Sequence, residues 1–448
     1  MNMADKIRAD ASPEKRLFIS LITRDISLID AFLDIIDNSI NAALEPLAPQ
    51  LKTADGYQRL LANRRLKPRV QIDLTIGTNR ITVEDTAGGI SADMASKHVF
   101  KFGRSAEDAD SNDRLSVYGI GLKRAIFKCG NKIEITSENA KGGFELDLTV
   151  SDWAKKKLKK DEPWTFEITP RAATRKDLGT RITITQLYDD VVRRLADGLF
   201  EGQLRERIAR TYSFFIGRVV EISLNGKPIP KEVFDIGQNY SSHKFKSGTV
   251  TCNITAGMAR SPGKDFRDKN SGWFVFCNGR AVLFADKTRL TGWTGGGTGL
   301  PLFQPKHRPF LGTVFFVSAD PEALPWTTTK ASVNEESAVW QEAKRHMISV
   351  GRVVTSFLDN RYTEEGTEFA PADLQDATGK SVSVLAAAVG KAREFKPPKK
   401  EGSNAIRIQY SAKLKDVKMI ESYLRRPGMG GSEVGRYTFN YFLKNEVR

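Results

Sequence analysis

The hydrophobic and polar positions of this chain follow two periods, one typical of helices and one typical of strands. Helical spacing predicts helices over 13–46 and 119–130, and near 197–216 and 332–359. A period of two predicts strands over 70–76, 80–85, 131–137, 143–149, 163–169, 180–186, 272–279, 280–284 and 313–317, and residues 219–228 predict a strand, a turn and a second strand. This order favours an α+β fold, with helices on one face of a mixed sheet, followed by a second α/β unit.

Segments without a period separate these elements. Residues 47–69 mix Arg, Lys and Pro and predict a loop or a short helix, and the polar segment 101–118 predicts a mobile loop. The glycine-rich segment 291–299 predicts a flexible loop, and 360–403 contains Pro-, Gly- and Lys-rich linker material. The predicted domains are 1–195, 196–360 and a basic remainder, 361–448.

The charge of the chain is positive and unevenly distributed. The 448 residues carry a formal net charge of +15. Residues 391–448 hold 14 lysines and arginines against 6 acidic residues, and aromatic side chains lie among them. This balance favours a polyanionic partner such as nucleic acid, with general solubility as the alternative. For the aromatics, which include Tyr410, the alternative to stacking on nucleic acid is a small helical cap that buries them.

Cysteine, histidine and apolar content narrow the class of protein further. Three cysteines and four histidines are scattered without the spacing of a metal site, which favours a reducing cytoplasm. No run of 18 apolar residues predicts a membrane span, and the first residues lack an apolar signal core. We therefore expect a cytoplasmic protein that has no membrane partner.

The first predicted helix concentrates polar side chains on one side. Six of them fall within an arc of about 100°, namely Ser27, Asp30, Asp34, Asp37, Asn38 and Asn41. The rest of the helix is apolar, which predicts burial, and buried carboxylates and amides are costly unless something satisfies them. A cation with bound phosphates would do so. The alternative is an ordinary amphipathic helix with a solvated stripe.

Three glycine motifs follow the helix. After a strand, Asp85 enters a turn with Gly88 and Gly89, where a flat ligand can approach the backbone. Next, Gly119, Gly121 and Lys123 open a helix whose N–H groups can cradle phosphate, although no Walker A loop is present. Finally, a strand starts at Gly179-Thr180. Each motif alone is common, and the order of all of them carries the information.

In this order the motifs resemble those of the GHKL superfamily: gyrase-type topoisomerase ATPase domains, heat-shock chaperone ATPases, histidine kinases, MutL and microrchidia (MORC) proteins. The N-box resembles 34–38, the Asp-x-Gly-x-Gly box resembles 85–89 with Ala87 in place of the first glycine, and the end of the lid resembles 119–123. Bacterial MORC-like and MutL-like proteins are the most similar in motifs. The resemblance implies a Bergerat-fold ATPase domain and the cofactors ATP and Mg²⁺.

The resemblance continues into the second predicted domain. The segment Asn278-Gly279-Arg280 is similar to a strand and turn of MutL transducer domains. The segment 324–333 is similar to the transducer loop whose lysine reaches the γ-phosphate, which here is Lys330. The alternative for Lys330 is a solvated loop lysine. Residues 360–448 have no counterpart in this resemblance.

The resemblance also implies roles for individual residues. Asn38 holds Mg²⁺, Asp85 binds the adenine amine with help from Thr180, and Lys330 senses the γ-phosphate. The lid 101–123 folds over the phosphates and brings Gly119, Gly121 and Lys123 near them. Asp34 stands where most hydrolytic members have a glutamate as general base.

Because an aspartate is one methylene shorter than that glutamate, we expect slow hydrolysis at Asp34. Asp37 lies one position off that face, and we expect a structural role for it.

Three functional classes remain open. The first is an ATP-gated clamp associated with DNA, which dimerises through segment 1–25 when ATP binds. The second is a chaperone-like ATPase or regulatory subunit that acts on a protein partner. The third is a switch in a prokaryotic, anti-phage defence system with a partner from the same operon, suggested by the resemblance of 23–26 to bacterial GHKL proteins.

Overall fold

The computed structural model describes residues 14–63, 66–103, 115, 119–156, 164–172, 178–232, 235–259, 270–365, 381–383, 385, 393–396 and 411–447. The chain divides into two compact units, Met1–Pro397 and Pro398–Arg448. The described part of the first unit contains two β-sheets with their helices, and that of the second contains two α-helices. Most of the predicted mobile loop 101–118 lies outside the described residues.

The first sheet has eight strands. In spatial order they are β5 (Ile168–Arg171), β4 (Gly142–Thr149), β3 (Gly130–Asn139), β6 (Gly179–Leu187), β2 (Arg80–Asp85), β1 (Val70–Ile76), β7 (Val220–Leu224) and β8 (Lys227–Pro228). The sheet is mixed, because β1 pairs in parallel with β7 while its other pairings are antiparallel. The predicted α+β class with a mixed sheet is therefore confirmed.

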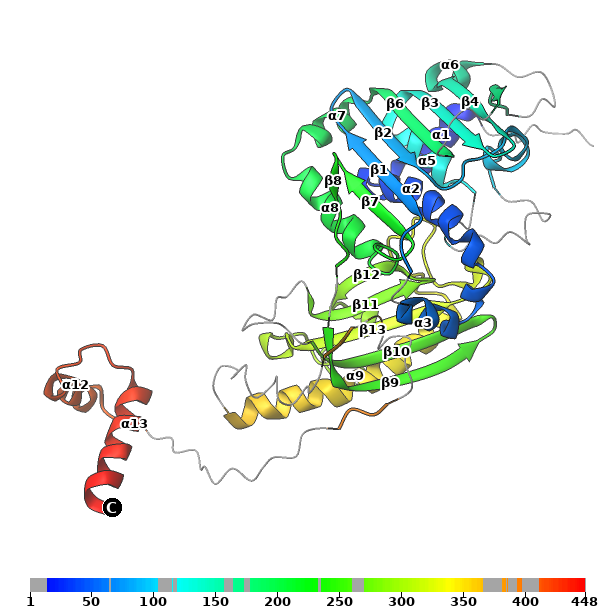
Figure 1. Cartoon of the computed structure of the whole chain (residues 1–448). Coiled ribbons are helices and arrows are strands. Elements are labelled where there is room, and N and C mark those ends of the chain that lie inside the picture. The colour runs from blue at the N-terminus through cyan, green and yellow to red at the C-terminus, as the bar shows by residue number, and fades with distance from the viewer. Residues whose placement is uncertain are drawn as a thin grey trace, which may run out of the picture. The chain divides into compact units, whose positions relative to one another are not determined.

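Helices cover one face of this sheet. They include α1 (Lys15–Arg24), α2 (Leu28–Leu44) and α5 (Gly121–Cys129), which lie behind the strands in Figure 1. Buried apolar side chains recur at every second strand position and meet in register across the sheet, as Ile133, Ile184 and Ile81 do. Because side chains alternate between the two faces of a strand, this apolar row packs against α2 and α5. The sheet therefore fixes the position of α2 and of its polar side chains.

The second sheet has six strands. In spatial order they are β12 (Arg280–Asp286), β11 (Gly272–Cys277), β13 (Phe310–Val317), β10 (Val250–Ala259), β9 (Asp235–Ser247) and β14 (Ser381–Ser383). The long helix α9 (Ala338–Glu365) packs against β10 and β9. The sequence analysis did not predict β9 and β10. The other α-helices among the described residues of this unit are α3 (Ala54–Ala62), α4 (Ala92–Met94), α6 (Val150–Lys155), α7 (Asp189–Ala196) and α8 (Phe200–Thr211).

Two predictions about element boundaries are wrong. The single helix over 13–46 is two helices, because the Ser27 side chain accepts a hydrogen bond from the Asp30 backbone N–H and caps a new helix. Ser27 therefore does not belong to the helical polar arc. The first sheet also continues past residue 195, since β7 extends it in parallel beside β1. The other predicted domain boundaries remain predictions.

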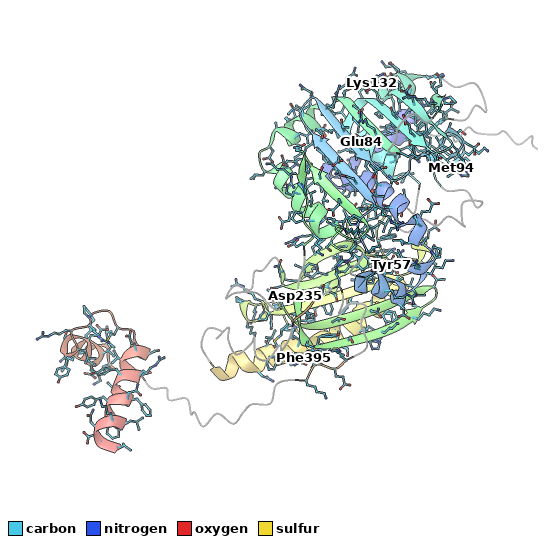
Figure 2. The ribbon with its side chains drawn as sticks, viewed as in Figure 1. Tyr57, Glu84, Met94, Lys132, Asp235 and Phe395 are labelled. Atoms are coloured by element: carbon cyan, nitrogen blue, oxygen red, sulfur yellow. The ribbon has the colours of Figure 1, made fainter. Side chains whose placement is uncertain are left out.

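The segment 47–69 connects the two sheets. It contains α3, whose Tyr57 is buried and donates from its hydroxyl to the Asn278 carbonyl oxygen at 3.1 Å. The Tyr57 ring also packs edge-on against Phe315 of the second sheet, with ring centroids 5.5 Å apart. Figure 2 labels Tyr57 where α3 meets this sheet. The segment that follows α2, the helix that packs on the first sheet, therefore also packs against the second sheet through Tyr57.

The predicted flexible loop 291–299 is held by hydrogen bonds. The Leu300 N–H donates to the Gly292 carbonyl oxygen at 2.7 Å. From α9, the Arg352 side chain donates to the carbonyl oxygens of Gly297 and Gly299. The glycines supply backbone conformations with positive φ that this turn requires, such as +93° at Gly295, rather than flexibility.

The second unit contains α12 (Leu414–Tyr423) and α13 (Gly431–Phe442). The alternative that its aromatics are buried is wrong for those described, since Tyr423 is 87% exposed and Phe442 is 58% exposed. Tyr410 lies outside the described residues. None of the described helices is both long and apolar enough to span a bilayer.

Candidate active site

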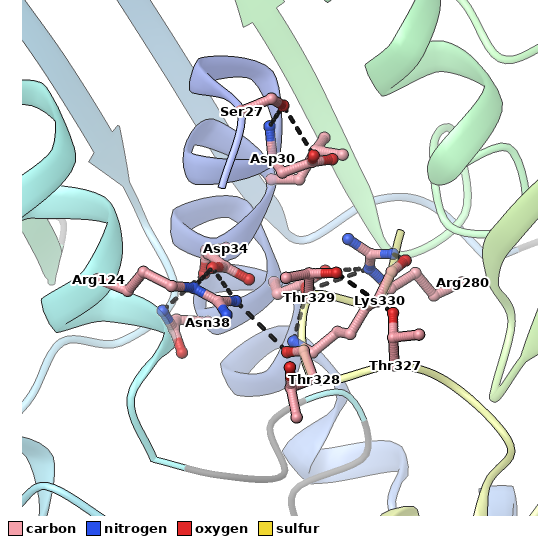
Figure 3. Close-up of polar contacts among 12 residues, drawn as sticks. Ser27, Asp30, Asp34, Asn38, Arg124, Arg280, Thr327, Thr328, Thr329 and Lys330 are labelled. Carbon is pink, nitrogen blue, oxygen red and sulfur yellow. Dashed lines mark hydrogen bonds and ion pairs between the residues drawn. The ribbon is translucent and has the colours of Figure 1, made fainter. Parts of the chain in front are cut away.

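Helix α2 carries the candidate catalytic residues. Its apolar side chains make it a buried helix, and its acidic residues are buried with them: Asp34 is 2% exposed and Asp37 is 1% exposed. Figure 3 shows the cationic side chains of Arg124, Arg280 and Lys330, which come from three other segments, converging on this helix. The prediction of a buried polar side that needs partners is therefore confirmed, and the structure names protein partners for both carboxylates.

Asp34 is bound by Arg124 of α5. Both Nε and Nη2 of Arg124 donate to Oδ2 of Asp34, at 2.9 and 2.5 Å. Burial raises the pKa of Asp34, while the charges of Lys330 and Arg124 act in the opposite direction. A carboxyl group with a raised pKa is a better proton acceptor than an exposed aspartate, which suits the predicted base.

Asp37 has three partners. Oδ2 accepts from Lys330 Nζ at 2.7 Å, Oδ1 accepts from the Tyr212 hydroxyl at 2.7 Å, and Arg280 Nε lies 2.9 and 3.1 Å from the two oxygens. Burial alone would raise the pKa of Asp37, but the Arg280 and Lys330 charges outweigh it and lower this pKa. Because Arg280 and Lys330 follow the first sheet in the chain, Asp37 links the two sheets.

The alternative that Lys330 is a solvated loop lysine is wrong. Lys330 is 6% exposed and its backbone adopts a φ of +54°. Two hydrogen bonds maintain this uncommon conformation: Lys330 N–H donates to the Thr327 carbonyl oxygen, and the Lys330 carbonyl oxygen accepts from Arg280 Nη1, both at 2.8 Å. Its ammonium therefore reaches α2 from the second domain, as a γ-phosphate sensor requires.

Asn38 lies one turn after Asp34 and is partly exposed. Its Nδ2 donates to the Asp34 carbonyl oxygen at 2.8 Å. This bond holds the side-chain amide by its nitrogen. The amide oxygen Oδ1, which is the atom that a hard cation binds, takes no part in the bond. The donor chemistry fits a magnesium ion shared with phosphate oxygens.

The adenine part of the predicted site forms around Asp85. Its Oδ2 accepts from the Ser39 hydroxyl at 2.7 Å, and its Oδ1 accepts from the Ala87 N–H at 2.9 Å. Thr180 lies opposite Asp85 in the β2–β6 register, and its hydroxyl lies 2.8 Å from that of Ser137. Carboxylate and hydroxyl groups therefore meet at one strand end.

Gly89 lies beside this strand end and has a φ of +66°. A Cβ at this position would lie 1.9 Å from the Glu138 carbonyl oxygen, so only glycine fits.

The phosphate part of the predicted site lies at the N-terminus of α5. Gly119 has a φ of +61°, and Gly121 is the first helical residue. A Cβ on Gly121 would lie 3.5 Å from Cγ of Asp34, so this helix start is next to the candidate base. The structure thus brings two distant motifs together, as predicted from their order.

Lys123 does not extend toward the α5 N-terminus. Its Nζ donates to the carbonyl oxygens of Val99 and Lys101, at 2.8 and 2.6 Å, and burial lowers its pKa to about 8. Lys101 begins the lid segment 101–123, Val99 lies just before it, and Lys123 ends it. In the structure Lys123 therefore joins the two ends of the lid, and its contact with phosphate remains a prediction.

Sequence reasoning missed four polar residues of this site: Ser39, Arg124, Tyr212 and Arg280. Ser39 and Arg124 each follow a predicted site residue, so position along the motif was the available signal. Arg280 is in a segment similar to transducer domains, but its partner Asp37 is 243 positions away in the chain. Nothing in the sequence of the predicted helix near 197–216 distinguishes Tyr212 from a side chain that only packs in the core.

Comparison with protein families gives one match. Residues 26–183 match the family described as histidine kinase-, DNA gyrase B- and HSP90-like ATPase. A comparison with curated proteins gave no significant match. The matched range contains Asp34, Asn38, Asp85, Lys123 and Thr180, whose individual roles remain predictions. The chain therefore contains a GHKL-type, ATP-binding ATPase domain.

Proposed function

We propose that this protein is a magnesium-dependent ATPase that works as a switch, in which the second domain reads the γ-phosphate through Lys330. The observation that carries the proposal is the meeting of two segments on α2: the Lys330 ammonium lies 2.7 Å from Asp37, next to Asn38 in the chain. A lysine that comes from another sheet and is buried beside the candidate metal ligand can transmit a change in phosphate charge to that sheet.

Each residue has a defined part in this mechanism. Asn38 would hold the magnesium ion, which would supply positive charge to neutralise the phosphates. Asp85 accepts from the adenine amine, and Gly89 lets the Glu138 backbone pack closely beside this strand end. Asp34 accepts a proton from water as the water oxygen attacks the γ-phosphorus, and the bond to the leaving ADP breaks. Slow turnover follows from the shorter reach of Asp34.

The test of this function is nucleotide binding and hydrolysis by the whole chain. We expect calorimetry to show Mg-dependent ATP binding, and phosphate release to show slow turnover that Asp34→Asn removes. Binding that needs neither Mg²⁺ nor Asn38 would contradict the site. Binding without any hydrolysis by the parent would leave a binding switch and contradict the ATPase.

We further propose that ATP drives formation of a homodimeric clamp on DNA, of the MORC-like or MutL-like kind. The support is the net charge of +15 and the 14 basic residues in 391–448. Phosphate neutralisation by such residues releases counterions, so DNA affinity should fall steeply with salt. Light scattering with a non-hydrolysable ATP analogue tests dimerisation. A chain that stays monomeric and binds no DNA, with or without the analogue, favours a chaperone-like or regulatory action on a protein.

The motif likeness of 23–26 to bacterial GHKL proteins supports a defence role, and we propose that the switch controls an effector from the same operon. Co-purification of the native protein tests this context. Recovery of a stoichiometric partner that depends on ATP would support it. Recovery of the protein alone under both nucleotide conditions would contradict it.

A further inference from the structure

Arg124 has no part in the roles given so far. It follows Lys123 on α5, and both its side chain and that of Asp34 are buried, at 6% and 1% exposure. Two of its nitrogens, Nε and Nη2, donate to the same oxygen, Oδ2 of Asp34. Two charge-assisted bonds to one oxygen restrict the rotation of the carboxylate.

This arrangement leaves the two oxygens of Asp34 in different surroundings. While Oδ2 is bound by Arg124, Oδ1 lies 3.6 Å from the position that a Cβ on Gly121 would take. Gly121 begins α5, whose N-terminal N–H groups are the candidate phosphate cradle. Oδ1 therefore lies outside the two Arg124 bonds and close to the helix start where phosphate and water are expected.

A second contact holds the guanidinium from the other domain. The Thr328 carbonyl oxygen lies 3.5 Å from Arg124 Nη2, and Thr328 belongs to the loop that carries Lys330. Figure 3 shows Arg124 between Asp34 and this loop. The orientation of Arg124 thus depends on both α5 and the sensor loop.

We propose that Arg124 is a positioning residue for hydrolysis, which holds Oδ2 of Asp34 so that Oδ1 accepts the proton of the attacking water. This inference rests on the proposed ATPase function. The water oxygen forms the bond to the γ-phosphorus, its proton passes to Oδ1, and the bond from the γ-phosphorus to the ADP oxygen breaks. Arg124 gains and loses no proton, because a guanidinium stays charged. It matters here because aspartate has less reach than glutamate and depends more on its orientation.

The test is a double-mutant cycle between Arg124 and Asp34. We compare Arg124→Gln, Arg124→Lys, Asp34→Asn and the two combinations by single-turnover phosphate release and by calorimetry with a non-hydrolysable ATP analogue. Misplacement of a reacting group costs up to about 10²-fold in rate. Arg124→Gln should lose 10- to 100-fold, on the order of that limit, with analogue affinity within about twofold. Arg124→Lys should recover part of the rate.

The decisive result is the effect of Arg124→Gln on the Asp34→Asn protein. If Arg124 acts through Asp34, the second substitution causes no further loss of rate. A further loss, a parallel loss of analogue affinity, or faster hydrolysis in Arg124→Gln would overturn the proposal, since Arg124 would then bind phosphate directly or restrain the base.

Arg210→Gln is the matched control. Arg210 also binds a carboxylate, that of Glu232, with Nε at 2.8 Å and Nη2 at 3.4 Å, and its side chain is 12% exposed. It should hydrolyse ATP at the parental rate. If Arg124→Gln does not fold, the same cycle with Arg124→Lys decides, because a lysine cannot make two bonds to Oδ2. A parent that does not hydrolyse ATP overturns the proposed function as well, whereas a hydrolysing parent with an inert Arg124→Gln overturns only this inference.

Discussion

Removing the Lys330 ammonium tests how the two domains are coupled. Lys330→Met keeps most of the side-chain length and removes the charge that lies 2.7 Å from Asp37. Asp37 keeps its bonds to Arg280 and Tyr212. It therefore loses one charge-assisted hydrogen bond, and not all of the partners that offset the cost of burying its charge. Such a bond contributes about 1.5–3 kcal/mol, and complete loss of a buried partner costs about 3–5 kcal/mol. We therefore expect the free energy of unfolding to fall by about 2 kcal/mol.

The same substitution should affect nucleotides unequally. To reach a γ-phosphate, the ammonium exchanges the Asp37 carboxylate for a phosphate, so only the difference between these two ion pairs appears in the affinity. We expect affinity for a non-hydrolysable ATP analogue to fall about tenfold, which corresponds to about 1.4 kcal/mol. Affinity for ADP should change little, because ADP has no phosphate at the sensor position.

Calorimetry with the analogue and with ADP, together with urea unfolding, measures both effects. Lys306→Met is the control, since Lys306 also forms an ion pair, with Asp359 at 2.7 Å, outside the candidate site. It should leave both nucleotide affinities unchanged. Equal losses of affinity for ADP and the analogue in Lys330→Met would refute the role of Lys330 as a γ-phosphate sensor. No loss of stability would refute a stabilising ion pair between Lys330 and Asp37.

Four further results are expected. Asn38→Ala should abolish Mg-dependent ATP binding, because the metal loses its protein ligand, and unchanged affinity in calorimetry would contradict the site. Asp34→Asn should still bind ATP while hydrolysis falls about 10²–10⁴-fold, and a parental rate would show that Asp34 is not the base. Burial lowers the pKa of Lys123 from 10.5 to about 8, so the cost of burying its charge is full below pH 8 and is relieved as the pH rises toward 10.5. In urea unfolding, the free energy of unfolding of the parent should therefore rise relative to that of Lys123→Met across that range, and a constant difference would contradict the lowered pKa. Deleting 391–448 should reduce the salt dependence of DNA binding while ATP binding survives, and an unchanged salt slope would move the DNA contact to 59–69 or to the dimer interior.

Local patterns were sufficient for most of the elements that build the site. The segments 70–76 and 80–85, which have a period of two, are strands with the predicted bounds. In a strand with one buried face every second residue is apolar, so the sequence pattern shows the strand directly. The break between α1 and α2 was missed although Ser27 is a favoured capping residue, because apolar periodicity continues across it. The strands β9 and β10 were missed, and they pair with each other from Val250 and Ser247 onward.

The sequence by itself determined the chemical inventory of the site and its order. Asp34, Asn38, Asp85 and the glycines at 119 and 121 were predicted together, because each motif needs only neighbours along the chain. Gly88 and Gly89 were predicted to let a flat ligand approach the backbone, whereas at Gly89 the close neighbour is the Glu138 carbonyl oxygen, 1.9 Å from where a Cβ would lie.

Tertiary structure alone decided which charges meet. Asp34 is paired with Arg124, 90 positions away, and Asp37 is paired with Arg280 and Lys330, 243 and 293 positions away. Lys123, which the motif places near phosphate, donates instead to two carbonyls at the start of the lid. Periodicity fixes which face of an element is polar, but the partner of a buried charge depends on how two sheets pack, and desolvation makes that choice energetically decisive.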